Sequence, residues 1–208
     1  MATLLYIEAS PRKQRSHSIK VADAFLDAYR SANPGDKVDT LDLWSTELPA
    51  FNGDMINAKY AVMHGAEPSS AEQTAWGEVE QICKRFTEAD KYLFSVPMWN
   101  FGIPYVLKHY IDVITQPGFS WSFDPDAGYS GLVSGPVAAI YSSGGAYHEG
   151  SGAEAFDQQK PYFEGWLGFI GLSDVSSVTV APTLEAPDNV AVSVNTAIGE
   201  AKKLAATF

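Results

Sequence analysis

The sequence predicts an α/β fold, a three-layer sandwich in which helices cover both faces of a five-stranded parallel sheet. Five short apolar runs typical of strands alternate with helix-length segments, and 46% of the 208 residues are hydrophobic while 19% are charged. Such alternation implies parallel strands joined by right-handed crossovers. We expect the strand order 2-1-3-4-5, which is common in sheets of this kind. Because the chain contains no repeat or linker-like stretch, residues 1–208 are expected to form a single domain.

The first half of the chain is expected to hold three strands and two helices. Apolar runs at 4–7, 38–44 and 92–96 predict the strands. The first helix shows a helical period on its buried face, formed by Ile19, Ala22, Phe25, Leu26 and Tyr29. A second helix begins at a capping-box pattern, Ser70 to Gln73. Its buried face is expected to contain Trp76, Val79, Ile82, Cys83 and Phe86.

The second half continues the alternation. Pro104 suits the first turn of a helix that ends near Gly118. The inward residues of this helix are expected to be Val106, Leu107, Tyr110, Ile111 and Ile114. Strands at 137–141 and 175–180 and helices at 157–171 and 188–205 complete the pattern. Two apolar-rich insertions, Pro49–Ser69 and Gly118–Gly135, are expected to cover a partner subunit or a bound ligand.

Composition excludes several classes of function. The formal net charge is -11, which disfavours binding to nucleic acid or to an anionic membrane. No apolar stretch reaches the ~18 residues of a membrane span, and the first residues do not resemble a signal peptide. The single cysteine, Cys83, fits a reducing compartment, so we expect a cytoplasmic protein. The scattered histidines show no metal-ligand spacing, so no metal site is expected.

The loop Pro97-Met98-Trp99-Asn100-Phe101-Gly102-Ile103-Pro104 follows the third predicted strand. In an open α/β sheet, ligands bind at this carboxyl edge. Met98, Trp99 and Phe101 offer apolar faces and Asn100 offers an amide, which together suit a flat heteroaromatic ring. The alternative is that the three large side chains are core residues capping a strand.

A second loop, from Ser10 to Ser18, follows the first strand. Three of the 14 basic residues fall within positions 12–15, and serine hydroxyls flank them. Hydroxyls, backbone N–H groups and the positive end of the next helix make a phosphate site. The alternative is that Ser18 only caps its helix and the basic side chains are solvated.

A third loop, Ser142-Ser143-Gly144-Gly145, leaves the fourth strand. Adjacent glycines permit positive φ and close approach of backbone N–H groups to a ligand. His148, just beyond, is a candidate substrate contact because of its place in the loop. Of the three loops, one therefore predicts a phosphate site and the other two predict a ring site.

Cys83 lies on an apolar helix face and is expected to be a packed thiol.

Together these segments resemble a known family. Residues 97–112 and Gly118-Phe119-Ser120 are similar to the signature of bacterial FMN-dependent NADH-azoreductases and NAD(P)H:quinone oxidoreductases, which have a flavodoxin-like fold. The resemblance implies that Ser10, Ser16, His17 and Ser18 hold the FMN phosphate. It implies that the isoalloxazine ring is lined by Met98, Trp99, Asn100 and Phe101, with Ser142, Ser143, Gly144 and Gly145 at its far edge. Phe169 matches a phenylalanine that approaches the site in several members.

The resemblance also implies the activity. Hydride would pass from NADH or NADPH through FMN to quinones and azo compounds in a ping-pong cycle, with the catalytic chemistry on the flavin. Members are homodimers with the sites at the interface. Where the family often has arginine this chain has Ser143, and its 146–157 segment is longer; both departures bear on acceptor range and nicotinamide preference. The alternative is a flavodoxin-like electron-transfer protein without small-molecule turnover, whose acidity would suit basic redox partners.

Overall fold

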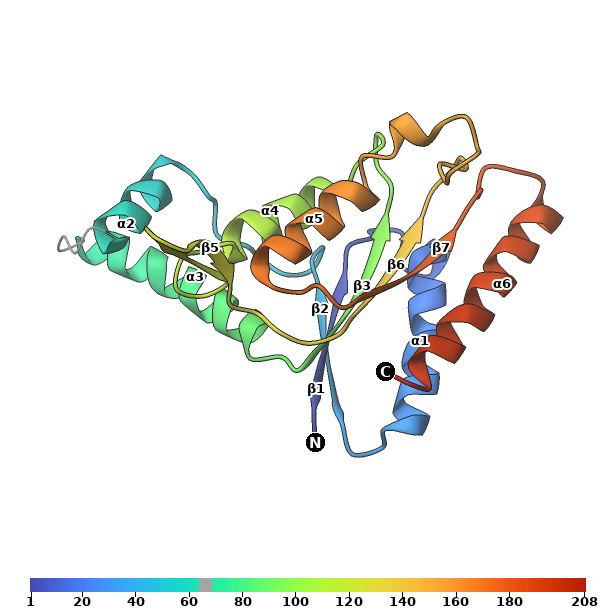
Figure 1. The fold of residues 1–208 in the computed structure, drawn as a ribbon, viewed down its shortest axis with the longest axis horizontal. Coiled ribbons are helices and arrows are strands. Elements are labelled where there is room, and N and C mark those ends of the chain that lie inside the picture. Colours follow the sequence, from blue (N-terminus) through green and yellow to red (C-terminus); the bar gives the residue numbers. More distant parts are fainter. Residues whose placement is uncertain (64–68) are drawn as a thin grey trace.

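A five-stranded parallel sheet forms the centre of the described part of the chain (Figure 1). The structure is a computed structural model and describes residues 1–63 and 69–208. In spatial order the strands are β2 (Lys37–Asp42), β1 (Thr3–Glu8), β3 (Lys91–Pro97), β6 (Val137–Ser142) and β7 (Val175–Val180). All neighbouring strands in this sheet are parallel. Since β6 and β7 are its fourth and fifth strands along the chain, the predicted order 2-1-3-4-5 is confirmed.

Helices cover both faces of the sheet and give the three predicted layers. One face carries α1 (His17–Ala32) and α6 (Pro187–Ala205), which lie side by side (Figure 1). The other face carries α3 (Ser70–Thr87), α4 (Tyr105–Ile114) and α5 (Lys160–Ile170), with α2 (Gly53–Met63) packed on α3. Two short 3₁₀ helices, η1 (Lys13–Arg15) and η2 (Glu154–Phe156), lie in loops.

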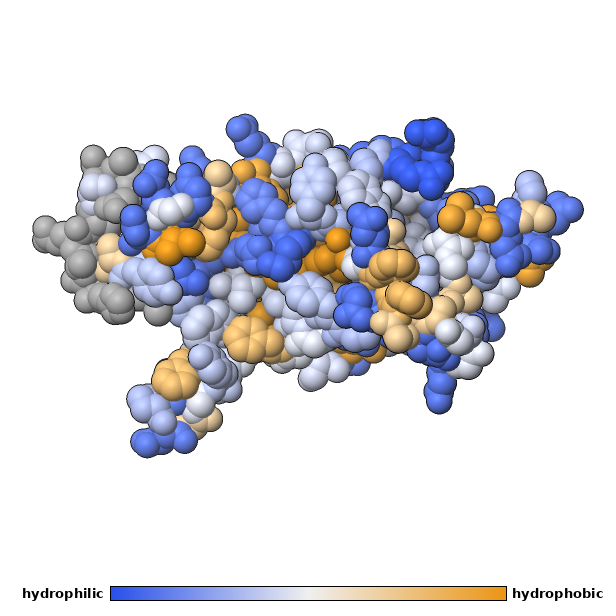
Figure 2. Space-filling model, turned by 90° about the horizontal axis from the view of Figure 1, so that it is seen from above, coloured by the Kyte–Doolittle hydropathy of each residue, from blue (hydrophilic) through white to orange (hydrophobic). Residues whose placement is uncertain are grey.

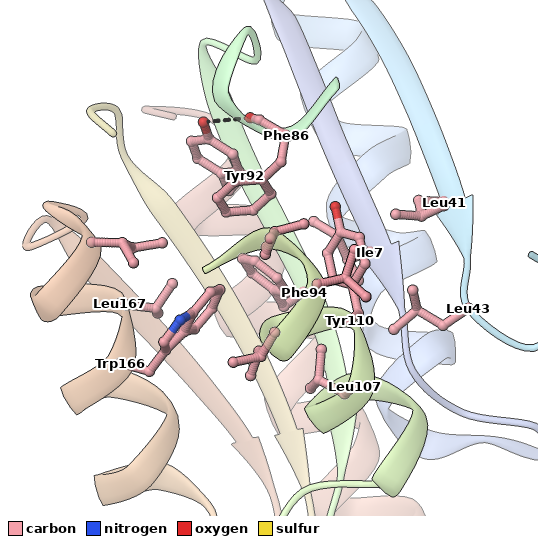
Figure 3. Packing of buried hydrophobic residues seen from close by; sticks show 14 of the residues in the cluster. Ile7, Leu41, Leu43, Phe86, Tyr92, Phe94, Leu107, Tyr110, Trp166 and Leu167 are labelled. Carbon is pink, nitrogen blue, oxygen red and sulfur yellow. Dashed lines mark hydrogen bonds between the residues drawn. The ribbon is translucent and has the colours of Figure 1, made fainter. Parts of the chain in front are cut away.

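The alternating side chains of the strands divide the core into two clusters. In β3, Tyr92 and Phe94 face the α3–α5 layer, while Leu93 faces α1 and α6. Figure 3 shows the first cluster, in which Phe94 lies among side chains that include Tyr110 of α4 and Trp166 of α5. The inward residues expected on α1 and α4 are all buried. On α3, Ile82 is only partly buried, whereas its four predicted companions are buried.

Both predicted insertions contain regular structure that the sequence analysis did not assign. The segment Gly118–Gly135 holds an antiparallel hairpin of β4 (Trp121–Asp124) and β5 (Gly128–Gly131). The segment Pro49–Ser69 holds α2, and its residues 64–68 lie outside the described residues. Two helix ends also differ, because Pro104 is the N-cap of α4 rather than part of its first turn, and α4 ends at Ile114, before Gly118.

The carboxyl edge of the sheet collects the loops that the sequence analysis singled out. The first loop joins β1 to α1, the second joins β3 to α4, and the third leaves β6. Figure 2 views the molecule from this edge and shows hydrophobic and hydrophilic residues lying next to each other on the surface. The hairpin of β4 and β5 lies against α5. The fold therefore places all three candidate loops on one side of the molecule.

Candidate functional site

The three loops adjoin one another because their strands are neighbours in the sheet. The N–H of Ala9, just past β1, donates to Ser95 O of β3 at 3.2 Å. The N–H of Met98, just past β3, donates to Ser142 O of β6 at 2.7 Å. These bonds continue the parallel register beyond the strands. The three loops thus form one continuous rim at the carboxyl edge of the sheet. This rim consists of the serine hydroxyls after β1, the aromatic side chains after β3 and the glycine pair after β6.

The loop after β1 buries three serine hydroxyls at the N-terminus of α1. Ser10, Ser16 and Ser18 are each at most 3% exposed. Ser16 Oγ lies 3.2 Å from Ser18 Oγ and accepts a hydrogen bond from Ile19 N at 3.4 Å. Ser16 is therefore the N-cap of α1, and the alternative that Ser18 caps this helix is wrong. The first turn of a helix leaves backbone N–H groups without partners inside the helix, so this loop can bind an anion.

The three basic residues of this loop do not act alike. Lys13 Nζ pairs with Glu8, at the end of β1, and with Asp42 Oδ1, at the end of β2, at 2.5 Å. Burial opposes the charged form of Lys13, but the bonds to Asp42 and Glu8 outweigh it and raise its pKa. Lys13 thus ties the loop to two strands, and the exposed Arg12 and Arg15 remain as positive charges beside the hydroxyls.

His17 is the first residue of α1 and is half-buried. Its pKa is lowered from the ordinary value of 6.5, chiefly by burial and further by the charges of Arg12 and Lys20. The ring is therefore neutral at pH 7 and carries one N–H donor. A neutral donor at a helix N-terminus is compatible with a bound phosphate.

The loop after β3 makes a tight turn that presents Phe101. Trp99 and Gly102 exchange two backbone hydrogen bonds, each 2.9 Å long. Between them Asn100 has φ 47° and Phe101 has φ 70°. Two successive positive φ angles are typical of a type I′ turn, which normally contains asparagine and glycine. Phe101 holds this conformation although its side chain has a Cβ, and the residue is 44% exposed, so the core does not require it there.

Aromatic side chains from distant segments surround this turn. Trp44, which follows β2, lies 5.6 Å from Trp99 between ring centroids and donates its Nε1 hydrogen to Ala9 O at 3.0 Å. Tyr105 of α4 contacts both of these rings. On the other side, Phe156 of η2 lies 5.2 Å from Phe101. The sequence analysis did not assign Trp44 or Phe156 to the site, although Trp44 ends the predicted strand 38–44 at the carboxyl edge.

The loop after β6 is held by its neighbours rather than by positive φ. Neither Gly144 nor Gly145 has a positive φ, contrary to the conformational reason given for the glycine pair. A Cβ on Gly144 would lie 2.7 Å from Leu184 Cδ1, the end of an exposed side chain that can move aside, so close packing does not by itself require glycine at this position. Ser142 and Ser143 are buried, and Ser143 Oγ donates to Gly145 O at 2.8 Å.

Two hollows flank the rim. One, of about 260 Å³, joins the second and third loops, and its lining includes Met98, Ser143 and His148. The other is an open groove of about 690 Å³ whose lining includes Trp99 and Asn100. His148 is exposed and its Nδ1 lies 2.9 Å from Glu149 O, so the structure brings this candidate substrate contact beside the third loop.

Phe169 lies apart from the rim. The N-terminal end of α5 is fixed at the carboxyl edge, because Gln159 Nε2 donates to Val96 O at 3.0 Å. Phe169 is ten residues further along the helix, which is about 15 Å away at ~1.5 Å per residue. Its ring packs on Trp121 and Tyr129 of the hairpin, with centroids 5.9 Å apart in each pair. Within one chain, the structure does not bring Phe169 to the other candidate residues.

The residues present fit FMN. Buried hydroxyls and the N-terminus of α1 suit the phosphate, and the aromatic turn beside them suits the ring. In the part of the chain that the structure describes, the backbone N–H groups of Gly144 and Gly145 have no acceptor, so they are available to the polar edge of a ring. Among the described residues no group of three or more His, Cys, Asp and Glu could hold a metal ion. None of the described helices is long and apolar enough to cross a membrane.

Comparisons with known proteins agree with this geometry. Residues 2–204 match the model of a family described by its flavodoxin-like fold. The chain is 49% identical, over the full length of both chains, to an FMN-dependent NADH:quinone oxidoreductase of Nitratidesulfovibrio vulgaris (strain DP4). A protein of the same name from Desulfotalea psychrophila is 47% identical over 88% of this chain and 87% of its own.

Solved structures give the same picture. An azoreductase from Bacillus anthracis str. Sterne has a TM-score of 0.92 and 32% identity, with full coverage of both chains. An FMN-dependent NADH-azoreductase from Bacillus anthracis str. Ames Ancestor, in complex with FMN, has a TM-score of 0.89 and 25% identity, covering all of this chain and 99% of that chain.

Proposed function

The chain belongs to the family with the flavodoxin-like fold, and on that basis we propose that it is an FMN-dependent oxidoreductase that passes hydride from NADH or NADPH to quinones and azo compounds. One observation carries the proposal furthest: the sheet sets three buried hydroxyls at a helix N-terminus beside a strained aromatic turn. This arrangement matches a ligand with a phosphate at one end and a flat ring at the other. The names of the relatives at 47–49% identity support the same activity.

Bound FMN supplies hydride acceptance and donation, so the protein needs to provide no acid, base or nucleophile. The chain binds and orients. Ser10, Ser16 and Ser18 would hold the phosphate through their hydroxyl hydrogens, and His17 would add an N–H donor. Trp99 and Phe101 would exclude water from one side of the ring and orient it.

We infer a ping-pong order, in which the oxidised nicotinamide leaves before the acceptor binds. Phe101, which is 44% exposed, would cover one face of the ring together with Trp99 and leave the opposite face open. A nicotinamide and a quinone are both flat and would occupy that open face in turn. Steady-state rates at several quinone concentrations should then give parallel lines in double-reciprocal plots.

We infer that the protein acts as a homodimer. The hairpin and α5 expose an aromatic group in this single chain, with Phe123 57%, Tyr129 65% and Phe169 39% exposed. Exposed apolar patches of this kind mark interaction sites. We propose that Phe169 contacts substrate across this interface, at the carboxyl-edge rim of the second copy.

One-domain organisation and a cytoplasmic location complete the proposal. The family match spans 2–204 and supports a single domain. Cys83 is buried and burial raises its pKa to about 12, so the thiol is unreactive and its free state is compatible with the cytoplasm.

The proposed function is tested on the purified chain with FMN, NADH and a small quinone. We expect FMN uptake at micromolar or lower concentration, seen as quenching of flavin fluorescence, and continuous NADH oxidation that depends on the quinone. Asn100→Ala should weaken both. A chain that binds FMN and oxidises neither NADH nor NADPH would instead be an electron carrier.

A further inference from the structure

The loop after β7 closes on the Ser142–Gly145 loop through Thr183 and Leu184. Thr183 Oγ1 donates to Ser143 O at 2.9 Å, and Thr183 N donates to Ser143 O and Gly144 O at 3.1 Å each. Leu184 N donates to Gly144 O at 3.1 Å. Two successive carbonyl groups are therefore bound by one short segment on the β7 side.

This pattern departs from that of a strand. In a strand, successive carbonyl groups point alternately to the two neighbouring strands. Ser142 O follows that rule and points to the β3 side, where it accepts from Met98 N. Ser143 O comes next and points to the β7 side, but Gly144 O then points to the β7 side as well. The alternation stops at Gly144, where Thr183 and Leu184 hold the second carbonyl.

The direction of these carbonyl groups fixes the direction of two N–H groups. In a trans peptide, the N–H of the following residue points opposite to the C=O. The N–H groups of Gly144 and Gly145 therefore both point away from Thr183, toward the β3 loop that carries Met98 and Phe101. Within the described residues neither N–H has an acceptor. Successive free N–H groups on one side of a chain can bind a negative or partly negative oxygen or nitrogen.

We propose that Thr183 is a positioning residue that aims the N–H groups of Gly144 and Gly145 at the edge of the flavin ring where negative charge develops on reduction. The inference rests on the proposed function. Hydride from NADH brings two electrons and one proton, so the ring gains one negative charge until a solvent proton arrives. Fixed donors stabilise that charge at no cost of reorganisation.

The side chain of Thr183 is suited to this role. Its hydroxyl is the one side-chain donor among the four bonds that hold the two carbonyl groups. A β-branched residue has few χ1 rotamers, so the hydroxyl loses little freedom on binding Ser143 O. Valine has the same shape without the donor, and serine keeps the donor without the methyl group.

The test compares Thr183→Val, Thr183→Ser and wild type, with Thr207→Val as the matched control. Thr207 Oγ1 also donates to a backbone carbonyl, Leu204 O at 3.3 Å, but near the chain end and away from the rim. Two quantities are measured for each protein: the Kd of oxidised FMN and the midpoint potential of bound FMN. Together they give the Kd of reduced FMN.

For Thr183→Val we expect oxidised FMN to bind within about twofold of wild type and reduced FMN to bind about tenfold more weakly. A tenfold change corresponds to the loss of about one net hydrogen bond from the Gly144 and Gly145 N–H groups to the charged ring. The midpoint potential then becomes more negative. Thr183→Ser and Thr207→Val should match wild type. Thr183→Ala gives the same comparison if the valine variant does not fold.

Three results would overturn the proposal: an unchanged potential in both Thr183→Val and Thr183→Ala, an equal loss of affinity for the two redox forms, or a serine variant as impaired as the valine variant. These outcomes differ from failure of the proposed function. In that case wild type itself takes up no FMN, or its bound FMN is not reduced by NADH or NADPH.

Discussion

At the scale of the residue, Phe101 combines a strained backbone with an exposed aromatic ring. A side chain with a Cβ at φ 70° costs roughly 1 kcal/mol or more relative to glycine. The ring is 44% exposed and touches Phe156 and Tyr147, contacts too few to account for the conformation by packing. The proposed contact of the exposed ring with FMN would account for this energetic cost.

Phe101→Gly should separate stability from binding. Glycine adopts positive φ freely, so we expect the free energy of unfolding to rise by roughly 0.5–1 kcal/mol in the absence of FMN. FMN affinity and turnover should fall at least about tenfold because the variant lacks the aromatic ring of Phe101 that would stack on the flavin. Urea unfolding and flavin fluorescence titration measure the two effects. A variant that is less stable than wild type would show that Phe101 holds the fold together.

Residue roles were predictable where the residue type names the chemistry, and not where they depend on distant partners. The buried serines and the aromatic turn were found from local sequence. Lys13 is one of the three basic residues in the predicted phosphate loop, but it pairs with Glu8 and Asp42. Asp42 lies 29 positions further along the chain and comes close to Lys13 only through the β1–β2 register. Thr183 reaches Ser143 across 40 positions, and no local pattern marks such a contact.

At the scale of the element, the Arg85–Asp39 pair joins α3 to β2. Arg85 Nε and Nη2 bind the two carboxylate oxygens of Asp39 at 3.0 and 2.9 Å, and Nη2 also donates to Thr40 O at 3.2 Å. This hydrogen-bonded pair lowers the pKa of Asp39. Because the folded-state pKa is lowered, the pair stabilises the fold above the ordinary pKa of Asp39 and loses that effect as the pH falls through the lowered value.

Arg85→Met should therefore cost stability at neutral pH and progressively less in acid. We expect about 1 kcal/mol at pH 7, since the bidentate geometry is good but the pair is partly solvated. Urea unfolding at pH 7 and near pH 2 measures the change. Lys84→Met is the control on the same helix, because Lys84 lies 3.9 Å from Glu80 and should contribute only a few tenths of a kcal/mol. An Arg85 effect as large near pH 2 as at pH 7 would contradict the account.

The elements themselves were predictable where hydrophobic period and burial agree. The five sheet strands are apolar on one or both faces and were all located from their sequence. The hairpin was missed although it carried a signal, the alternation of Trp121 and Phe123 before the turn residues 125–127. Helix α2 gave less signal, since Met55 and Ala58 are buried while Ile56 and Tyr60 are exposed, so its apolar residues do not share one face.

At the scale of the whole molecule, the exposed aromatic group on the hairpin and α5 is the proposed dimer interface. Phe169→Asp puts a charge into the proposed interface, and we expect the dimer dissociation constant to rise on the order of a hundredfold. Sedimentation velocity over a range of concentrations measures it. Val192→Asp is the control, because Val192 is 66% exposed on α6, on the opposite face of the sheet. A wild-type monomer, or an unaffected Phe169→Asp dimer, would refute this interface.

The most direct test of the whole account is the visible spectrum of the purified protein with FMN, before and after NADH is added without oxygen. We predict flavin absorption bands that are retained through gel filtration and that bleach when NADH is added. Bands that persist with both NADH and NADPH, or a protein that stays colourless after incubation with FMN, would contradict the proposed function.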